Sequence, residues 1–297
     1  MKIALFYRKQ NENDKEFIIS AFRILKELNI QLVVHEKLTN LSYLENSIEG
    51  CPTFSTHEEL KMIPHIDFFL SFGGDGSFIA SVKLVKNLGI PMIGVNTGRI
   101  GFLTTITRKN FEHQIQMLCN KSFTIEKRKL LHLNTNINLP LENHFALNDI
   151  TVKATDEDSV CGIDVWLNEV HVNTYWADGL IVATPTGSTA YSLSCSGSII
   201  HPTSDVNIIT PIASHSLNIR PIIVNANDKI RIKVQSRRKN KFLLTIDNER
   251  IIASTEITLC IEKEDFEISM IRFPNSDFFS VIREKLLWGI DLRNNSH

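Results

Sequence analysis

The chain has 297 residues, which exceeds a typical single domain, so we expect two domains. Hydrophobic residues make up 43% and charged residues 22%, values typical of a globular protein with a sizeable core. The formal net charge of −1 provides no electrostatic argument for binding to nucleic acid or to a membrane surface.

The five cysteines are dispersed without a CxxC spacing, and the ten histidines form no HExxH pair. An odd, scattered set of thiols predicts reduced cysteines in a cytoplasmic protein rather than disulfides or a zinc site. We therefore expect no metal site built by the protein alone. Residues 1–5 predict a first strand rather than a signal peptide, and no apolar run is long enough to cross a bilayer.

The first 120 residues alternate between short apolar runs and helical spacings. Residues 36–60 show no period, and we expect a loop there with a short helix near 57–62. The alternation predicts a Rossmann-like parallel sheet with crossover helices, in which ligands bind at the carboxyl ends of strands. The predicted strands are 3–7, 32–35, 66–72 and 90–95, and the predicted helices are 17–28, 78–88 and 111–118.

From about Phe123 the apolar residues recur with a period of two, which predicts an antiparallel β-sandwich. The basic segment 236–241 is expected to be a solvated hairpin tip, and a phosphate clamp is the weaker interpretation. Beyond the strands, helical spacing over 278–287 predicts a helix that packs back on the N-terminal half. The predicted domains are an α/β domain, 1–122 plus about 272–297, and a β-sandwich domain, 123–271.

The segment SFGGDGS at 71–77 directly follows a predicted strand. Its glycines Gly73, Gly74 and Gly76 let backbone N–H groups approach an anion, and the start of the next helix favours phosphate. Asp75 is a poor phosphate ligand, but it suits a proton acceptor, a metal ligand or a partner of a ribose hydroxyl. The combination predicts a phosphoryl-transfer or nucleotide site. The alternative is a helix N-cap with tight-turn glycines.

Two further motifs carry residues suited to a nucleotide. The segment NTGRIGFL at 96–103 follows a strand, and alone it is a weak signal. The segment DGLIVATPTGSTAYS at 178–192 carries five hydroxyl side chains between Thr184 and Ser192, besides the aromatic Tyr191. These hydroxyls suit a sugar or base edge, and the ring suits stacking. The alternative is a hairpin whose hydroxyls bond their own backbone.

Together these motifs resemble the NAD kinase family. That family shows a GGDG cradle, an NxGxxGFL loop, a short acidic pair and a DG…TPTGSTAY segment, in this order. Here they correspond to 73–76, 96–103, Asn148-Asp149 and 178–197, and the resemblance covers most of the chain. Asp149 departs from the pattern, because many members have Glu at that position.

The resemblance implies an N-terminal α/β domain, a C-terminal β-sandwich and a nucleotide site in the cleft between them. It implies Mg²⁺-dependent transfer of the ATP γ-phosphoryl group to the 2′-hydroxyl of the adenosine ribose of NAD, which forms NADP. The phosphates of ATP would hold most of the Mg²⁺, with Asp75 as the candidate protein ligand. The long edges of the antiparallel sheets predict a homo-oligomer, a dimer or a tetramer, built through the β domain. The resemblance adds that Asp178 reaches the dinucleotide of a neighbouring subunit.

The resemblance makes Asp75 the catalytic residue, whose carboxylate polarises or deprotonates the attacking hydroxyl. Nucleotide contacts are expected from the cradle, the loop after it, the acidic pair, the hydroxyl-rich segment and one turn. These residues are Gly73, Gly74, Gly76, Asn96, Phe102, Asn148, Asp149, Asp178, Thr186, Thr189, Ala190, Tyr191, Ser194, Asp247 and Asn248.

Three other functions compete with this interpretation. A diacylglycerol or sphingosine type of lipid kinase shares a GGDG cradle, but the hydroxyl-rich segment suits a polar nucleotide and no basic amphipathic helix is evident. A non-catalytic dinucleotide sensor has little use for Asp75 next to phosphates. An NAD-dependent dehydrogenase is the least favoured, because no GxGxxG follows the first strand.

Overall fold

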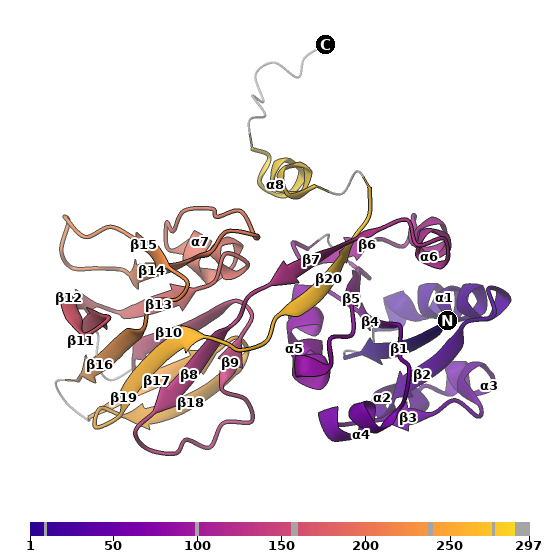
Figure 1. Cartoon of the computed structure of the whole chain (residues 1–297), viewed down its shortest axis with the longest axis horizontal. Coiled ribbons are helices and arrows are strands. Elements are labelled where there is room, and N and C mark those ends of the chain that lie inside the picture. The colour runs from indigo at the N-terminus through magenta and orange to yellow at the C-terminus, as the bar shows by residue number, and fades with distance from the viewer. Residues whose placement is uncertain (9–10, 99–100, 156–159, 237–239, 275–276, 289–297) are drawn as a thin grey trace, which may run out of the picture. The chain divides into compact units, whose positions relative to one another are not determined.

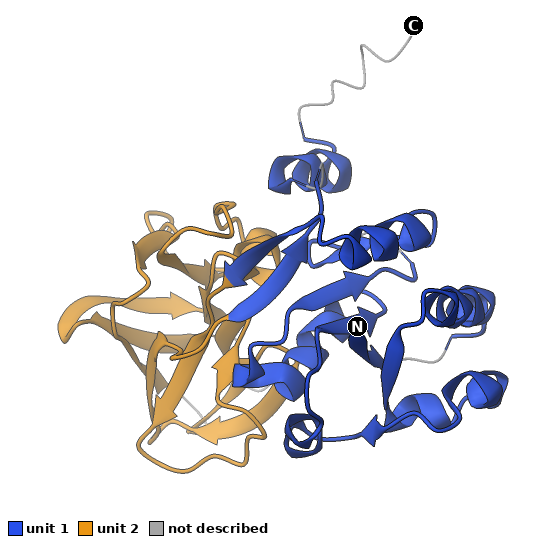
Figure 2. Ribbon diagram, turned by 45° about the vertical axis from the view of Figure 1, so that its right-hand side comes forward, with its two compact units in different colours: residues 1–127, 268–297 blue, residues 128–267 orange. Residues whose placement is uncertain are grey.

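Figure 1 shows the computed structural model, which describes residues 1–8, 11–98, 101–155, 160–236, 240–274 and 277–288. The chain divides into two units, drawn in separate colours in Figure 2. Unit 1 comprises Met1–Lys127 and Ile268–His297, and unit 2 comprises Arg128–Glu267. None of the helices in the described ranges is both long and apolar enough to span a membrane.

Unit 1 is built on one sheet whose strand order is β3-β2-β1-β4-β5-β20-β7, with β6 paired to β5. The pairs of β1 with β2 and β4, and of β4 with β5, are parallel, which confirms the predicted parallel sheet. The strands are β1 (Lys2–Tyr7), β2 (Gln31–His35), β3 (Thr53–Phe54), β4 (Phe68–Phe72), β5 (Met92–Val95), β6 (Thr104–Ile106), β7 (Thr124–Arg128) and β20 (Ile268–Arg272).

Helices that cross between these strands bury their apolar stripe on the sheet. In α1 (Lys15–Glu27) the residues Ile18, Phe22 and Leu25 are fully buried, which is the spacing of three and four that a helix presents on one side. The other regular crossover helices are α5 (Asp75–Val85) and α6 (Phe111–Cys119). The terminal helix α8 (Phe278–Leu286) also belongs to unit 1 and has Ile282 buried, as the sequence predicted.

The segment 36–60 differs from the loop that the sequence predicted. It contains two one-turn helices, α2 (Glu36–Thr39) and α3 (Glu45–Ile48), and the edge strand β3. The short helix expected near 57–62 is present as α4 (His57–Met62). Elements of two to four residues are shorter than the period that would reveal them, so their apolar residues carry no pattern.

Unit 2 is a sandwich of two six-stranded sheets, as the period of two predicted. Their orders are β15-β14-β13-β10-β17-β18 and β12-β11-β16-β19-β8-β9. All the pairs recorded within these sheets are antiparallel; in β16 (Ile230–Gln235), alternate residues Ile230, Ile232 and Val234 are buried. The other strands are β8 (Leu131–Thr135), β9 (Phe145–Ala146), β10 (Asp149–Ala154), β11 (Cys161–Leu167), β12 (Val170–Ala177), β13 (Gly179–Ala183), β14 (Val206–Ile212), β15 (Ile222–Asn225), β17 (Lys241–Ile246), β18 (Glu249–Ser254) and β19 (Thr258–Lys263).

The boundaries between the two units in the sequence lie close to β7 and β20. β7 and β20 are neighbours in the sheet of unit 1, so the boundaries fall after Lys127 and before Ile268. Residues 237–239 of the hairpin tip expected at 236–241 lie outside the described residues. Arg99 and Ile100 of the second motif lie outside them as well.

Candidate functional site

The phosphate cradle, Gly73–Ser77, lies at the carboxyl end of β4 and opens α5. The Gly73 N–H donates to Val95 O of the neighbouring strand at 2.9 Å, which holds the turn against the sheet. Gly74 is the N-cap residue of α5, and a Cβ placed on Gly74 or on Gly76 would have no atom within 4 Å. The space beside these two glycines is therefore open, and the start of this 11-residue helix carries the partial positive charge that favours phosphate.

The carboxylate of Asp75 binds the loop that follows β5. Its Oδ2 accepts a 2.7 Å hydrogen bond from Phe102 N, and its Oδ1 accepts bonds from Leu103 N at 3.1 Å and Thr104 N at 3.3 Å. The Thr104 hydroxyl donates to the same oxygen at 3.2 Å. The N-cap residue of α5 is Gly74, and the recorded side-chain bonds of Asp75 go to this loop rather than to its own helix, so Asp75 is not the cap.

The loop after β5 fits around this carboxylate because Gly101 has no side chain. A Cβ at Gly101 would lie 1.6 Å from Asp75 Oδ1. Asn96, expected to contact nucleotide, is buried, and its amide donates to Thr104 Oγ1 at 3.0 Å and accepts from Gly98 N at 2.7 Å. The Asn96 side chain therefore shapes the loop from within unit 1, whereas the half-buried Phe102 ring lies nearer to solvent.

Three basic side chains lie around the cradle or its neighbouring loop that the sequence did not predict. Arg8, at the end of β1, donates to Gly76 O at 3.3 Å. Lys285 of α8 places its Nζ 4.0 Å from Asp75 Oδ2. Arg108 bridges Thr97 O and the Asp14 carboxylate, with N–O distances of 2.5 Å to each, and so anchors the loop after β5. Lysine and arginine far apart in the sequence carry no local signal of this convergence.

In unit 2 the pair Asn148-Asp149 lies at the start of β10, against the turn that joins β17 to β18. The Asp247 carboxylate accepts from three successive amides, those of Leu147 at 2.9 Å, Asn148 at 2.8 Å and Asp149 at 3.2 Å. Asp247 is thus satisfied as an anion by backbone donors. Asn148 is half-buried and Asn248 is exposed, so both have surface available to a ligand.

The Asp149 side chain is buried beside this anion. Burial, and then the charge of Asp247, raise the pKa of Asp149 to about 7, while a 3.0 Å hydrogen bond from the Thr151 hydroxyl opposes the rise. At neutral pH the Asp149 carboxyl is therefore partly protonated and serves as both a donor and an acceptor of hydrogen bonds.

The hydroxyl-rich loop, residues 184–194, bonds itself and the two residues just before β10. Thr184 Oγ1 donates to Leu147 O at 2.6 Å and accepts from Gly187 N at 3.0 Å. A Cβ on Gly187 would lie 2.0 Å from Asn148 O, so glycine is needed where the loop touches the Asn148-Asp149 pair. Ser188, Thr189 and Ser192 also bond protein atoms, which agrees with the structural interpretation of these hydroxyls.

The remaining candidates of unit 2 differ in accessibility. Tyr191 is half-buried, with Lys153 Nζ 5.8 Å from its ring centroid, and Ser194 is exposed. Ala190 is half-buried beside them. Asp178 is half-buried between β12 and β13, and both of its backbone groups bond neighbouring strands. The structure brings Tyr191, Ala190 and Ser194 onto one loop next to the Asn148-Asp149 pair.

Arg128 is a buried cation beneath the hydroxyl-rich loop. It is 2% exposed, and its Nη1 donates to the Thr186 hydroxyl at 3.2 Å. Thr186, expected to contact nucleotide, is itself buried at 6% exposure and is held by this guanidinium. Nothing in the sequence indicated this role, because an arginine ordinarily indicates a solvated residue.

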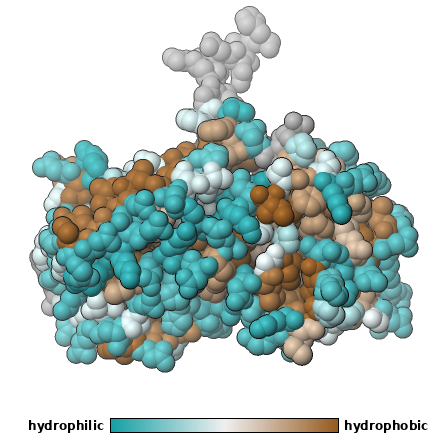
Figure 3. Space-filling view, in the orientation of Figure 1, coloured by the Kyte–Doolittle hydropathy of each residue, from teal (hydrophilic) through white to brown (hydrophobic). Residues whose placement is uncertain are grey.

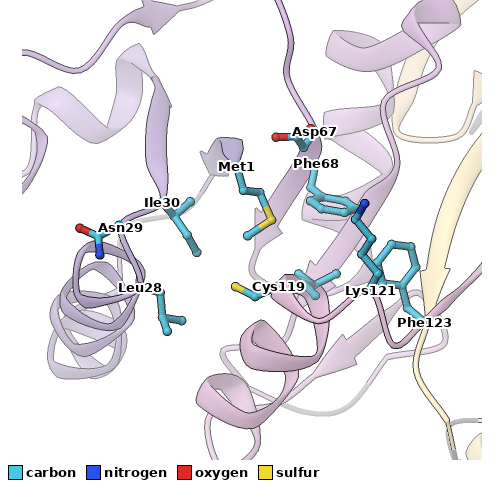
Figure 4. A pocket seen from close by; sticks show the side chains of 10 residues that line it. Met1, Leu28, Asn29, Ile30, Asp67, Phe68, Cys119, Lys121 and Phe123 are labelled. Atoms are coloured by element: carbon cyan, nitrogen blue, oxygen red, sulfur yellow. The ribbon is translucent and has the colours of Figure 1, made fainter.

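A pocket of about 480 Å³ in unit 1 lies away from the cradle (Figure 4). Its lining comes from the amino ends of the strands, including Met1, Ile30 and Phe68, and from the end of α6, whereas the cradle follows the carboxyl end of β4. This pocket therefore does not belong to the candidate site.

The described side chains include no group of three or more His, Cys, Asp or Glu residues that could hold a metal ion. Near the cradle, Asp75 offers one carboxylate. A single carboxylate fits a Mg²⁺ ion that arrives on a triphosphate, because Mg²⁺ is usually bound by one or two carboxylates plus substrate phosphates.

Two family models match the chain, one over its N-terminal part and one over its C-terminal part. The ATP-NAD kinase N-terminal domain matches residues 3–123, and the ATP-NAD kinase C-terminal domain matches residues 147–273. Among solved structures, a yeast NADH kinase complexed with NADH has a TM-score of 0.84 at 20% identity, covering 99% of this chain and 89% of the other. An NAD kinase from Archaeoglobus fulgidus in complex with ATP has a TM-score of 0.73 at 24% identity, covering 97% and 99%.

Relatives of higher identity span the whole chain. An NAD kinase of Flavobacterium psychrophilum is 41% identical over 99% of this chain and 100% of its own length. The NAD kinases of Christiangramia forsetii and Cytophaga hutchinsonii are 37% and 36% identical, each over 99% of this chain and 100% of their own length. With both family models matched and this identity over the full length, the chain belongs to the NAD kinase family.

Proposed function

We propose that this protein is an NAD kinase that transfers the γ-phosphoryl group of ATP to the 2′-hydroxyl of the adenosine ribose of NAD. The ribose oxygen forms a bond to the γ-phosphorus, the bond from that phosphorus to the β–γ bridging oxygen breaks, and ADP leaves. The proton of the hydroxyl passes to the Asp75 carboxylate. The observation that carries the proposal is this ionisable carboxylate, fixed by four hydrogen bonds at the mouth of a glycine cradle.

In unit 1 we assign the triphosphate to the cradle. The exposed Gly74 and Gly76 offer amides at the start of α5, where no side chain obstructs an anion. Phosphoryl transfer depends mainly on positioning and charge neutralisation, so the protein needs no nucleophilic side chain. Asp75 is the side chain of the cradle that could hold a Mg²⁺ ion carried on the phosphates, and such an ion would neutralise part of their charge.

In unit 2 we assign the dinucleotide to the Asn148-Asp149 pair, the turn at Asp247-Asn248 and the outer residues of the hydroxyl-rich loop. The half-buried Tyr191 ring suits stacking on a base, and Asn148 and Asp149 suit the ribose hydroxyls. The buried Thr186 supports this surface from below, through Arg128. In unit 1 the buried Asn96 holds the loop after β5 through Thr104.

A single assay tests the reaction. Purified protein with ATP, Mg²⁺ and NAD should form NADP and ADP in equal amounts, and Mg²⁺ removal by a chelator should stop the reaction. Diacylglycerol and sphingosine should not be phosphorylated, because the matched families and relatives are NAD kinases. Binding of NAD without turnover would favour the dinucleotide sensor and contradict the proposal.

We also propose that the protein is a homo-oligomer, a dimer or a tetramer, assembled through unit 2. The edge strands β12 and β15 carry exposed apolar side chains, with Val170 at 70% and Ile223 at 53% exposure, and Leu217 nearby in the chain is 90% exposed. Hydrophobic surface gathers in Figure 3 at the upper left, where Figure 1 places β14 and β15. Sheet edges are usually blocked or covered, and exposed apolar patches mark interaction sites, so these edges suit a subunit contact.

Light scattering tests the assembly. Val170→Glu should convert the oligomer to a monomer, whereas Met62→Glu, on a similarly exposed apolar residue of unit 1, should not. Asp178 is proposed to complete the site of the neighbouring subunit, so the monomeric variant should lose activity. A monomer that is fully active at nanomolar concentration would contradict both statements.

We infer a reducing, cytoplasmic location from the thiols. All five cysteines are free, and burial raises the pKa of Cys51, Cys195 and Cys260, which keeps these thiols protonated and unreactive.

A further inference from the structure

The ammonium group of Lys285 lies beside the carboxylate of Asp75. Lys285 Nζ is 4.0 Å from Asp75 Oδ2 and 4.4 Å from the centroid of the Phe102 ring. The residue comes from the last turn of α8, far from the cradle in the sequence, and its side chain is 24% exposed. The end of α8 thus brings a positive charge to the cradle.

This pair is poorly explained as a structural salt bridge. A separation of 4.0 Å is too long for a hydrogen bond, and the donors of the 102–104 segment already hold the carboxylate in position without the lysine. Among the described residues no acceptor is recorded for the Lys285 ammonium, so its three N–H groups remain available. A partly exposed pair of this geometry adds little to stability.

Binding of a triphosphate beside Asp75 requires a positive charge at the cradle. A triphosphate at the start of α5 meets neutral amides, and it also meets the negative charge of Asp75. An anionic side chain next to phosphates is repulsive unless a cation lies on the same side of the site. The transferred group spreads negative charge over its oxygens, and a fixed ammonium stabilises that charge without reorganisation.

We propose that Lys285 is a further catalytic residue, whose ammonium donates hydrogen bonds to the γ-phosphoryl oxygens of ATP as the group passes to the acceptor hydroxyl. This role rests on the proposed kinase function. Lys285 keeps its proton throughout, because the proton of the acceptor hydroxyl goes to Asp75. The Phe102 ring positions the ammonium, since a cation over an aromatic face is held at about the separation observed.

The test compares three variants by steady-state kinetics and by calorimetry with ATP and ADP. Lys285→Met should lower kcat/KM for ATP by about 10–100-fold, typical of one lost hydrogen bond to a charged group, and Lys285→Arg should restore most of it. Affinity for ATP should fall about 10-fold while affinity for ADP, which lacks the γ-phosphoryl group, changes less than twofold. Arg283→Met removes the same charge from the same last turn of α8 and should leave all values near wild type.

The outcomes separate this inference from the function on which it rests. Wild-type protein that forms no NADP would contradict the kinase itself. Active wild type with an equally active Lys285→Met would contradict only the role of Lys285. Equal losses of affinity for ATP and for ADP in Lys285→Met would show that the lysine is structural and would overturn the proposal. A Lys285→Met variant whose circular dichroism spectrum shows loss of the fold would overturn it as well.

Discussion

The Asp75 carboxylate and the backbone N–H of Phe102 join two motifs that lie 27 residues apart in the chain, through a 2.7 Å hydrogen bond. With the bonds from Leu103 and Thr104, this contact makes the aspartate both the acid of the cradle and the anchor of the loop after β5. Substitution of Asp75 therefore affects chemistry and loop position together, and experiments must separate the two.

Asp75→Asn should lower kcat by about 10²–10⁴-fold, the usual contribution of a positioned general base. The amide keeps the size of the side chain but loses its basicity, and its NH₂ group would face N–H donors of the 102–104 segment. Some loss of stability, about 1–3 kcal/mol, should accompany the change. Steady-state kinetics and denaturant unfolding measure the two effects.

Thr104→Val is the control for loop position. It removes the hydroxyl that bonds Asp75, Asn96 and Gly101, but it leaves the carboxylate in place. The variant should be destabilised to a similar degree while keeping kcat within about tenfold of wild type. If Asp75→Asn and Thr104→Val lower kcat equally, the aspartate acts only as an anchor.

Tyr191→Ala should weaken NAD binding by about 1–3 kcal/mol, typical of losing one stacked aromatic ring. Tyr191→Phe keeps the ring and should bind NAD with nearly wild-type affinity. Calorimetry on both variants decides the matter. Unchanged affinity in Tyr191→Ala would show that this loop is only a structural hairpin.

Asp149 should make the free energy of unfolding fall as pH rises. Its pKa is raised from an ordinary value near 4 to about 7, so between these values the native state binds a proton that the unfolded state releases. The stabilising contribution is complete below about pH 4 and is lost as pH rises through about 7.

Asp149→Asn removes this titration and should flatten the decline in unfolding free energy between pH 5 and pH 8, measured by urea denaturation. Asp265→Asn, at an exposed carboxylate of the same unit, is the control and should keep the wild-type slope. An unchanged slope in Asp149→Asn would mean that other groups cause the pH dependence.

Arg128→Met should raise KM for NAD by about 5–30-fold, because the Thr186 hydroxyl loses its buried donor, a change worth about 1–2 kcal/mol. The value of kcat should change less, since Arg128 lies beneath the loop rather than at the cradle. Lys129→Met removes a charge from the next residue, which bonds Asp205 instead, and should leave KM unchanged. If Arg128→Met, like Lys129→Met, kept the wild-type KM for NAD, Arg128 would not position the loop.

The sequence by itself determined the longer strands and helices, the change from helical to strand periodicity, and the motifs, but not the short elements of 36–60. These properties follow from local spacing, because a buried stripe recurs every three to four residues in a helix and every two in a strand. Glycine at 73, 74 and 76 likewise indicated an anion site, since only backbone without side chains approaches phosphate closely.

Only the tertiary structure decided which side chains meet. Lys285, Arg8 and Thr104 converge on the cradle from three separate segments, and Asp247 lies against Asp149 from the far end of a neighbouring strand. The interaction energy of two charges depends on their distance in space, and the spacing of residues along the sequence does not give that distance. For the same reason, the sequence showed Asp75 as a candidate base, while its second role as the anchor of the 102–104 segment required the folded chain.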